Sequence, residues 1–413
     1  MTRFISFMRG LGPAWKAVVV TLSALVFSHI AVYDLMSVSF FSPMEKAADF
    51  RFSDFYTLVA DDRAVSRLDS DIVIVAVDGC RRDEIARALN DIDFCNPAAV
   101  GLDIAFSRPS DPDADPLVDA LASCSNLVMP VEAAEDSDGH FAVRHISWYD
   151  SVVAPSGGFA AVNIQGDRHT LSTVRDFKGF FPVSASDTIE SLPAALVGLV
   201  RPRSRHALAQ RDCREEAISY VSREFETFYP DEILDNADAI EGRIVLVGKI
   251  HDAADLHQTP LDNFMPGLVI QAHTTATILS GDFTRRLSQF EIHILAAIMC
   301  FVIAWANLWL TRTPAGPLCV RLIQMLLLYL MILVGTHAYI RWNIDLNFAF
   351  AILATSISVA ACDVFDGLFA KGALADKSVD IYRRLHNYFK PHEIETVPPA
   401  VVSDDDPGSA PQP

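Results

Sequence analysis

Residues 243–281 read RIVLVGKIHDAADLHQTPLDNFMPGLVIQAHTTATILSG, and this stretch decides the fold. Its first part, IVLVG at 244–248, is an apolar, β-branched run typical of a buried strand, and the glycine ends it at a turn. A loop with two aspartates and two histidines follows. The TP and PG pairs then mark turns. Residues 268–270 form either a strand or the start of a helix at 272–279, which Gly281 ends.

Two other runs share this apolar character: residues 71–78, DIVIVAVD, and residues 98–106, AAVGLDIAF. Strands buried on both faces have this composition, and the helical spacing at 82–89 joins the two runs into a parallel β-α-β unit. We therefore predict an α/β fold with a mainly parallel sheet. The shorter elements expected around it are helices at 116–122 and 192–199 and strands at 126–130, 219–221 and 224–228.

Three aspartates are candidates for a ligand site. Asp78 and Asp103 lie at the ends of two predicted strands, and Asp255 lies in the loop after the third. Ligands of parallel sheets bind beyond the carboxyl ends of the strands, so these carboxylates are the ligand-binding candidates. Carboxylate oxygens suit a hard cation or an amine. The alternative is structural, because an aspartate after a strand often caps a helix or accepts loop N–H groups.

The order of these motifs resembles the second class of CHASE domains, the cyclases/histidine kinases associated sensory extracellular domains. The resemblance rests on IVLVG, Asp255, TP, PG and the closing LSG, and it extends over residues 47–281. It implies a periplasmic sensor domain of α/β type. It places acidic residues at the candidate positions and assigns them no ligand and no metal.

Two further passages belong to the resemblance. Asp49 and Arg51 match a D-x-R-F element that opens such domains. Asp167 and Arg175 match part of a later passage, whose D-G pair is absent here. Alternation at 47–56 places the first two charges on one face and the phenylalanines on the other. We interpret all four as structural or signalling candidates, the first pair forming either an ion pair at the base of the domain or a link to the membrane.

Composition distinguishes the chain from plain soluble proteins and from nucleic-acid-binding proteins. Hydrophobic residues make up 51% of the 413 residues, and the mean hydropathy is +0.26, which predicts lipid-embedded segments. The 52 acidic residues outnumber the 33 basic residues, and the net charge is −19. We therefore expect no nucleic acid as a partner, because the sequence shows no extended basic patch to neutralise its phosphates.

Four apolar segments predict transmembrane helices, at 17–34, 288–310, 322–339 and 346–365. Basic residues lie in the N-terminal segment 1–16, in the loop after the second helix and beyond the fourth helix. By the positive-inside rule both termini are then cytoplasmic, and the sensor domain at 35–287 is periplasmic. This predicts a multi-pass protein of the bacterial inner membrane, with the lipid bilayer as a partner.

None of the seven cysteines has the C-x-x-C spacing of a zinc site. Cys80, Cys95, Cys124 and Cys213 fall in the predicted periplasmic domain. Pairing of Cys80 with Cys95, or of Cys95 with Cys124, is one interpretation, and buried free thiols are the other.

The C-terminal part predicts a cytoplasmic connector helix at 366–397, with a stripe of Ile381, Leu385 and Phe389 that suits a second copy of the chain. Residues 385–395 are similar to the connector F-x-x-Y-x-x-P-x-x-x-E that precedes the catalytic domain in membrane adenylate cyclases of this architecture. Residues 398–413 are rich in proline, aspartate and serine and predict a disordered tail. A catalytic domain does not fit in this remainder.

The motifs favour a receptor over an enzyme. The outer part has no nucleophile elbow, phosphate loop, H-E-x-x-H or kinase motif, so we expect no enzyme activity and no cofactor. A cue bound in the periplasm would be signalled through the spans to a separate cytoplasmic effector. The alternative is a non-sensing structural or assembly subunit of an envelope complex, and a homodimer is open in both cases. A periplasmic enzyme using the three aspartates is disfavoured, because no base and nucleophile accompany them.

Overall fold

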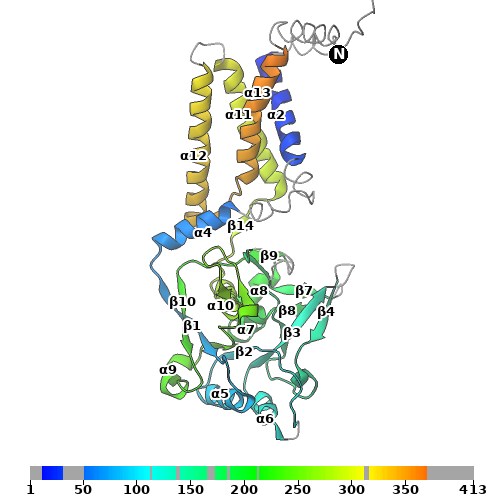
Figure 1. The fold of residues 1–413 in the computed structure, drawn as a ribbon, viewed down its shortest axis with the longest axis vertical. Coiled ribbons are helices and arrows are strands. Elements are labelled where there is room, and N and C mark those ends of the chain that lie inside the picture. Colours follow the sequence, from blue (N-terminus) through cyan, green and yellow to red (C-terminus); the bar gives the residue numbers. More distant parts are fainter. Residues whose placement is uncertain are drawn as a thin grey trace, which may run out of the picture.

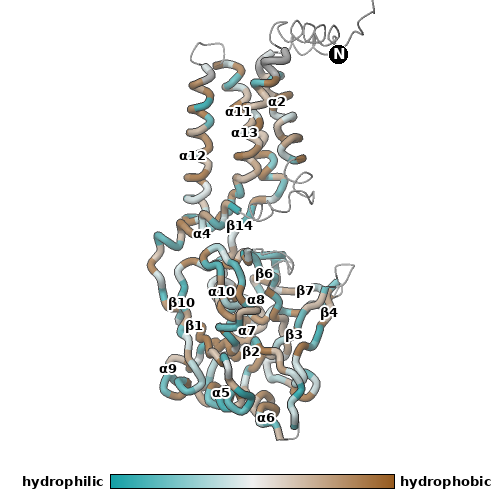
Figure 2. The backbone as a smooth tube through the Cα atoms, in the orientation of Figure 1, coloured by the Kyte–Doolittle hydropathy of each residue, from teal (hydrophilic) through white to brown (hydrophobic). Residues whose placement is uncertain are grey.

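The computed structural model describes residues 12–30, 51–111, 114–135, 140–164, 173–183, 187–211, 214–310 and 316–369. In this part of the chain, an α/β domain and a bundle of helices lie end to end (Figure 1). A short helix and two short strands join them. Figure 2 shows hydrophobic residues along the helices of the bundle, whereas the α/β domain mixes both kinds of residue.

The domain is built on a seven-stranded sheet in the order β10-β1-β11-β2-β3-β4, with β5 beside β3. Neighbouring strands are parallel except in the β3–β4 hairpin, so the predicted mainly parallel sheet is confirmed. β11 lies between the two strands of the predicted β-α-β unit. The strands are β1 (Arg67–Ala76), β2 (Ala99–Asp103), β3 (Leu127–Glu135), β4 (Phe141–His145), β5 (Phe159–Ala161), β10 (Arg223–Phe228) and β11 (Ile244–Gly248).

Helices cover both faces of this sheet. Val73 and Val75 of β1 belong to one hydrophobic core, and Ile72 and Ile74 belong to the other. Burial on both faces explains why the part of β1 from Ile72 to Ala76 is an unbroken apolar run, whereas its first half is polar and more exposed. The first core contains α5 (Arg82–Phe94), α6 (Pro116–Ser123) and α9 (Ala237–Ile240), and the second contains α7 (Leu192–Val200), α8 (Pro202–Ala209) and α10 (Gly267–Ser280).

Shorter elements complete the domain. The expected strand at 219–221 is wrong, because the chain there turns so that Ser219 N–H donates to Thr277 Oγ1 at 3.0 Å. The strand alternative at 268–270 is also wrong, because α10 already begins at Gly267. The remaining pairs are β6 (Asp176–Lys178) with β9 (Glu215–Ala217), β7 (Phe180–Pro182) with β8 (Thr188–Glu190), and β12 (Leu256–His257) with β13 (Met265–Pro266), and the 3-10 helices are η4 (Trp148–Ser151), η5 (Leu234–Asn236) and η6 (Ala253–Asp255).

The alternation seen at 47–56 does not produce a strand in the described residues. Helix α4 (Phe52–Arg63) follows directly on Arg51, whose backbone N–H donates to Asp54 Oδ2 at 3.0 Å. This contact caps the first turn, because it satisfies a backbone donor at the start of the helix. Over the twelve residues of α4 the helical spacing of polar and apolar residues prevails over the short alternation.

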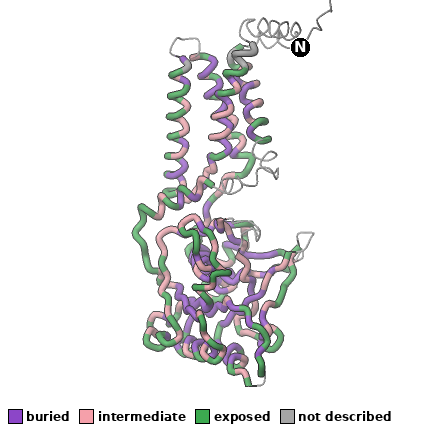
Figure 3. Tube along the Cα trace, in the orientation of Figure 1, coloured by how far each residue is buried: buried purple, intermediate pink, exposed green. Residues whose placement is uncertain are grey.

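The bundle contains α2 (Pro13–His29), α11 (Gln289–Leu310), α12 (Gly316–Trp342) and α13 (Ala349–Phe369). α2, α11 and α13 meet through small side chains such as Ala17, Ala304 and Cys362, as membrane helices do. α12 lies beside them and is exposed along much of its length (Figure 3).

Of the four predicted spans, two are candidate membrane spans by length and composition in the described residues. Gln289–Leu310 and Leu318–Trp342 are long and apolar enough to cross a membrane, whereas Ala14–His29 and Ala349–Val364 are shorter apolar helices. The predicted connector beyond Phe369 and the tail at 398–413 lie outside the described residues.

For three of the four domain cysteines, the structure distinguishes between disulfide pairing and free thiols. Cys80, Cys95 and Cys124 are free thiols, so neither proposed pairing forms. Burial raises the pKa of Cys124 to about 12, and the nearby charge of Asp93 adds to the effect. A thiol of this kind is inert. Cys213 lies outside the described residues.

Candidate functional site

Asp78 follows β1 and binds the loop that leaves β11. Its carboxylate accepts the backbone N–H of His251 at 2.8 Å and that of Ile250 at 3.1 Å, and the His251 ring lies 3.4 Å away. Burial alone would raise the pKa of Asp78, but the N–H groups of these two residues lower it overall. Asp78 therefore stays ionised and holds the loop against the edge of the sheet.

Asp103 ends β2 and lies opposite Gly248, the last residue of β11. Burial is the main cause that raises the pKa of Asp103 to about 7. The negative charge of Asp255 adds to this shift, and His257 opposes it. A carboxyl group with this pKa exchanges its proton near neutral pH, so its charge responds to small changes in its surroundings.

Asp255 and His257 come from the same loop, and their side chains contact each other at 3.1 Å. The Asp255 carboxylate also lies against Gly267, the first residue of α10. A Cβ atom at position 267 would come within 2.6 Å of Asp255 Oδ1, so the carboxylate approaches the start of the helix because no side chain intervenes. Negative charge is favourable there, because the helix presents unpaired N–H groups.

The three predicted aspartates do not line a single pocket in the structure. β11 separates the ends of β1 and β2, which puts Asp78 and Asp103 about 10 Å apart at two strand spacings. In the loop after β11, His251 lies beside Asp78, whereas Asp255 and His257 act electrostatically on Asp103. Among the described residues no group of three or more His, Cys, Asp or Glu side chains is placed to hold a metal ion, so the residues present do not fit one.

A second cluster of charges lies where the domain meets the bundle. Arg175 is 7% exposed and pairs with Asp54 of α4 through two contacts, Nε to Oδ1 at 2.6 Å and Nη2 to Oδ2 at 2.7 Å. Arg51 lies 3.2 Å from Asp176, which Arg286 also contacts. Arg51 and Arg175 are thus both in ion pairs at the base of the domain. Their predicted companions Asp49 and Asp167 lie outside the described residues.

Short polar segments connect this cluster to the bundle. β14 (Arg285–Arg286) follows α10 and pairs in parallel with β15 (Ile344–Asp345), which joins α12 to α13. The hydroxyl groups of Thr57 and Tyr339 are 3.0 Å apart, which links α4 to α12. Thr284 donates to Asn343 Oδ1 at 2.7 Å. Sequence reasoning missed these contacts, because the partners are far apart in the chain and no local pattern relates them.

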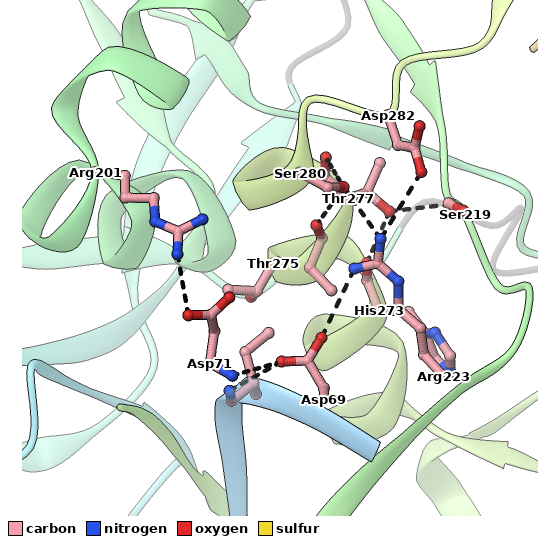
Figure 4. A network of polar contacts seen from close by, with 12 residues as sticks. Asp69, Asp71, Arg201, Ser219, Arg223, His273, Thr275, Thr277, Ser280 and Asp282 are labelled. Carbon is pink, nitrogen blue, oxygen red and sulfur yellow. Dashed lines mark hydrogen bonds and ion pairs between the residues drawn. The ribbon is translucent and has the colours of Figure 1, made fainter. Parts of the chain in front are cut away.

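α10 also takes part in a polar network that joins buried side chains such as His273 to exposed ones such as Asp282 (Figure 4). Arg223 of β10 lies 3.8 Å from both Asp69 and Asp282, and it donates to Ser280 at 3.1 Å. His273 lies beside Arg223 inside the domain, and burial lowers its pKa to about 4. α10 therefore holds a neutral histidine between the sheet and the segment that leads to the helical bundle.

A wide groove lies elsewhere on the domain, between the β3–β4 hairpin and α7 and α8. It has a volume of about 750 Å³, and Val131, Phe159 and Leu199 contribute to its apolar lining. Arg205 and Glu190, which form an ion pair, contribute charge. The groove is large enough for a small ligand, so it competes with the strand ends as a binding site.

Comparison with known proteins gives one match. A family model described as "CHASE2 domain" matches residues 25–311. No curated protein and no solved structure matches the chain.

Proposed function

The chain belongs to the CHASE2 domain family, and from this premise we propose that it is a bacterial inner-membrane receptor. CHASE2 domains are extracellular sensory domains, so the α/β domain is the sensory part. The cue binds at the carboxyl ends of β1 and β2, and the bundle carries the signal to a separate cytoplasmic effector. The proposal assigns no reaction to the chain.

The exposed aromatic residues of the bundle support its position in a bilayer. Phe290 and Trp309, at the two ends of α11, are 74% and 64% exposed. They are nineteen residues apart, or about 28 Å along the helix, which matches the hydrocarbon thickness of a membrane. Trp342 and Trp15 are exposed at the corresponding ends of α12 and α2. Aromatic residues at both interfaces are typical of membrane helices.

Four spans are part of the proposal. α13 is 21 residues long, and α2 packs against both α11 and α13. A helix in this position is surrounded by the same lipid as its neighbours. With four spans, both ends of the chain lie in the cytoplasm and the α/β domain lies in the periplasm, in agreement with the distribution of basic residues.

One contact carries the sensory proposal: the Asp255 carboxylate against Gly267 at the start of α10. The negative charge of Asp255 raises the pKa of Asp103 at the end of β2. Asp255 also lies at the start of α10, and the other end of α10 leads into β14 and α11. A ligand that binds Asp103 or Asp255 therefore changes the electrostatics at the start of this helix. A signal follows if the ligand binds one arrangement of the helix and loop more tightly than another.

The carboxyl groups at the ends of β1 and β2 and in the loop after β11 indicate the class of ligand. Asp78, Asp103 and Asp255 contribute carboxyl groups. The Asp78 carboxylate already accepts hydrogen bonds from the backbone N–H groups of Ile250 and His251. The best fit is a small molecule with a protonated amine, because an amine donates hydrogen bonds to carboxylates and lowers the pKa of Asp103 on binding. The proposed effector contact is the connector helix at 366–397.

The test is ligand-induced thermal stabilisation of the full chain in lipid nanodiscs, measured with a panel of small primary amines and amino acids. A ligand at about 100 times its Kd stabilises by about 2.7 kcal/mol, which is a shift of several degrees. We expect the shift for the unsubstituted chain and for Asp235→Asn, an exposed control. Asp103→Asn should lose it.

Three results would count against the proposal. An equal shift in all three proteins would move the ligand to another site, such as the groove beside α7. No shift with any amine, together with a stoichiometric protein that purifies with the chain, would favour the assembly subunit. Turnover of a ligand that is lost on Asp103→Asn would make the chain an enzyme.

A further inference from the structure

α12 exposes one face over most of its length. The helices α2, α11 and α13 pack closely against one another, whereas α12 lies at the outer side of the bundle and packs less closely against α11 and α13 (Figure 1). Val320 and Met331 of α12 are buried against these two helices. The side of α12 that faces away from them is exposed, so it meets lipid or another protein when the bundle lies in a bilayer.

The exposed face of α12 carries three leucines and one tyrosine, which we call the α12 seam. They recur at spacings of four, three and four residues and are Leu322, Leu326, Tyr329 and Leu333. This is the spacing of the a and d positions in a coiled coil. The sequence between Leu322 and Leu333 contains no charged residue. Arg321, just before the seam, lies 2.8 Å from Asp363 of α13.

Tyr329 lies near the middle of a candidate membrane span. In the span Leu318–Trp342 it is eleven residues from one end and thirteen from the other, or about 16 Å and about 20 Å along the helix. Its side chain is 59% exposed, and its hydroxyl has no hydrogen-bond partner among the described residues. Both distances exceed the length of a tyrosine side chain, so the hydroxyl cannot reach the headgroups.

A hydroxyl in this position needs a partner that lipid cannot supply. Hydrocarbon chains have no hydrogen-bonding groups, so an unpaired hydroxyl among them is unfavourable. Thr336 of the same helix avoids this, because its hydroxyl donates to the Ile332 carbonyl at 2.9 Å. A tyrosine hydroxyl lies too far from the backbone of its own helix to do the same. The seam therefore indicates a polar partner from outside the bundle.

We propose that the α12 seam packs against the α12 seam of a second copy of this chain, with the two Tyr329 hydroxyl groups hydrogen-bonded to each other. Two copies in one membrane have the same orientation, so their α12 helices run parallel. A two-fold axis along the membrane normal then places each seam residue opposite itself at the same depth. A tyrosine hydroxyl both donates and accepts, so the two tyrosines satisfy each other. The proposal rests on the membrane position of the bundle proposed above.

The contacts of α12 with α4 leave the seam free. Tyr56 of α4 packs against Gly335, and the hydroxyl groups of Thr57 and Tyr339 are 3.0 Å apart. These contacts lie beyond Leu333, toward the α/β domain. Each α12 is therefore held by its own domain at one end and by the second copy in the middle. A movement of the domain that reaches α4 then changes how the two copies meet, which gives the spans a route for the signal.

The first test is cysteine crosslinking of the full chain in native membranes. Leu326→Cys places a thiol in the seam, and Ile298→Cys is the matched control, because Ile298 is similarly exposed near the middle of α11. Cys319→Ala in every protein removes the natural thiol of α12. After oxidation with copper phenanthroline, we expect a disulfide-linked dimer for Leu326→Cys and no dimer above background for Ile298→Cys.

The second test isolates the hydroxyl. Tyr329→Phe keeps the ring, and the Kd of the two copies is measured by energy transfer between labelled chains in liposomes of increasing lipid content. We expect the Kd to rise by about 3- to 20-fold, the effect of one hydrogen bond between membrane helices. Val334→Ala is the control, because Val334 is exposed on the same helix outside the seam and should leave the Kd unchanged.

Four results would overturn the inference. A dimer through Ile298→Cys and not through Leu326→Cys would move the contact to α11, and a crosslink from Leu326→Cys to a protein of another mass would replace the second copy with a different subunit. An equal Kd for Tyr329→Phe and the unsubstituted chain would refute the hydrogen bond. A monomeric chain that resists extraction by sodium carbonate would refute the dimer alone, whereas a chain that carbonate releases would refute the membrane position as well.

Discussion

His273 makes the stability of the domain depend on pH in a way that one substitution isolates. The side chain is 4% exposed, and its ring lies 5.2 Å from the Tyr220 ring and 5.0 Å from the Phe225 ring. Its Nδ1 has no hydrogen-bond partner among the described residues. The positive charge of Arg223 disfavours a second cation at His273, and Arg223 itself lies 3.8 Å from both Asp69 and Asp282.

The magnitude follows from the difference between the folded and unfolded pKa values. Burial and Arg223 lower the pKa of His273 from 6.5 to about 4. The unfolded chain therefore binds this proton more tightly, so the folded state loses stability as pH falls from about 6.5 to about 4. At about 1.4 kcal/mol per pKa unit, the loss is about 3 kcal/mol at the acidic end.

The assay is denaturant unfolding of the full chain in mixed micelles at several pH values between 7 and 4. Trp148 is the only tryptophan between residues 51 and 288, so its fluorescence reports the domain once Trp15, Trp305, Trp309 and Trp342 are replaced by phenylalanine in every protein compared. His273→Phe keeps a ring between Tyr220 and Phe225 and removes the titration. Its free energy of unfolding should fall less on acidification than that of the unsubstituted chain, by about 3 kcal/mol.

Carboxyl groups also titrate in this range, so the comparison between proteins decides the result. His206→Phe is the control, because His206 is exposed on α8 and should leave the pH dependence unchanged. Parallel loss of stability in the unsubstituted chain and in His273→Phe would refute the reasoning. It would mean that His273 is hydrated or paired in solution.

Three further substitutions test the site and the junction. Asp54→Ala should destabilise the chain by about 3–5 kcal/mol, because it removes the carboxylate that pairs with the buried Arg175 guanidinium, and adding Arg175→Leu should recover part of that loss in the same unfolding assay. Burial raises the pKa of Asp103 from 3.8 to about 7, so the folded state loses stability as pH rises through this range. Asp103→Asn should therefore stabilise the chain more at pH 8 than at pH 5, by about 2 kcal/mol, and an equal effect at both would contradict the burial argument. Gly335→Ala should lower the melting temperature, because its Cβ would overlap the Tyr56 hydroxyl and lie 2.7 Å from Tyr56 Cζ, and Tyr56→Phe should relieve only part of the effect, because Cζ remains.

The central strands were predictable because burial on both faces leaves a plain record in the sequence. β2, β11 and the second half of β1 are apolar at nearly every position, since helices cover both faces of the sheet there. The end of α10 was predictable for a similarly local reason. Gly281 ends the helix in a left-handed conformation with φ of 71°, which glycine adopts readily. Local sequence is sufficient wherever the cause of a structure is itself local.

The arrangement of the candidate site could not be predicted in the same way. The position of β11 between β1 and β2 depends on pairing across more than 140 residues, and it separates Asp78 from Asp103. The partner of Arg175 is 121 residues away on α4, and nothing near either residue identifies the other. Charges show that ion pairs will form, but only the folded chain determines which charges meet.

The claim on which the account depends is that the α/β domain lies outside a membrane that the bundle crosses. The most direct test is labelling of Phe94→Cys in spheroplasts with a membrane-impermeant maleimide, measured as the increase over the unsubstituted chain. Thr313→Cys, between α11 and α12 in the sequence, serves as the control for the inner side. The account predicts that Phe94→Cys reacts in intact spheroplasts and that Thr313→Cys reacts only after lysis, and the reverse order would contradict it.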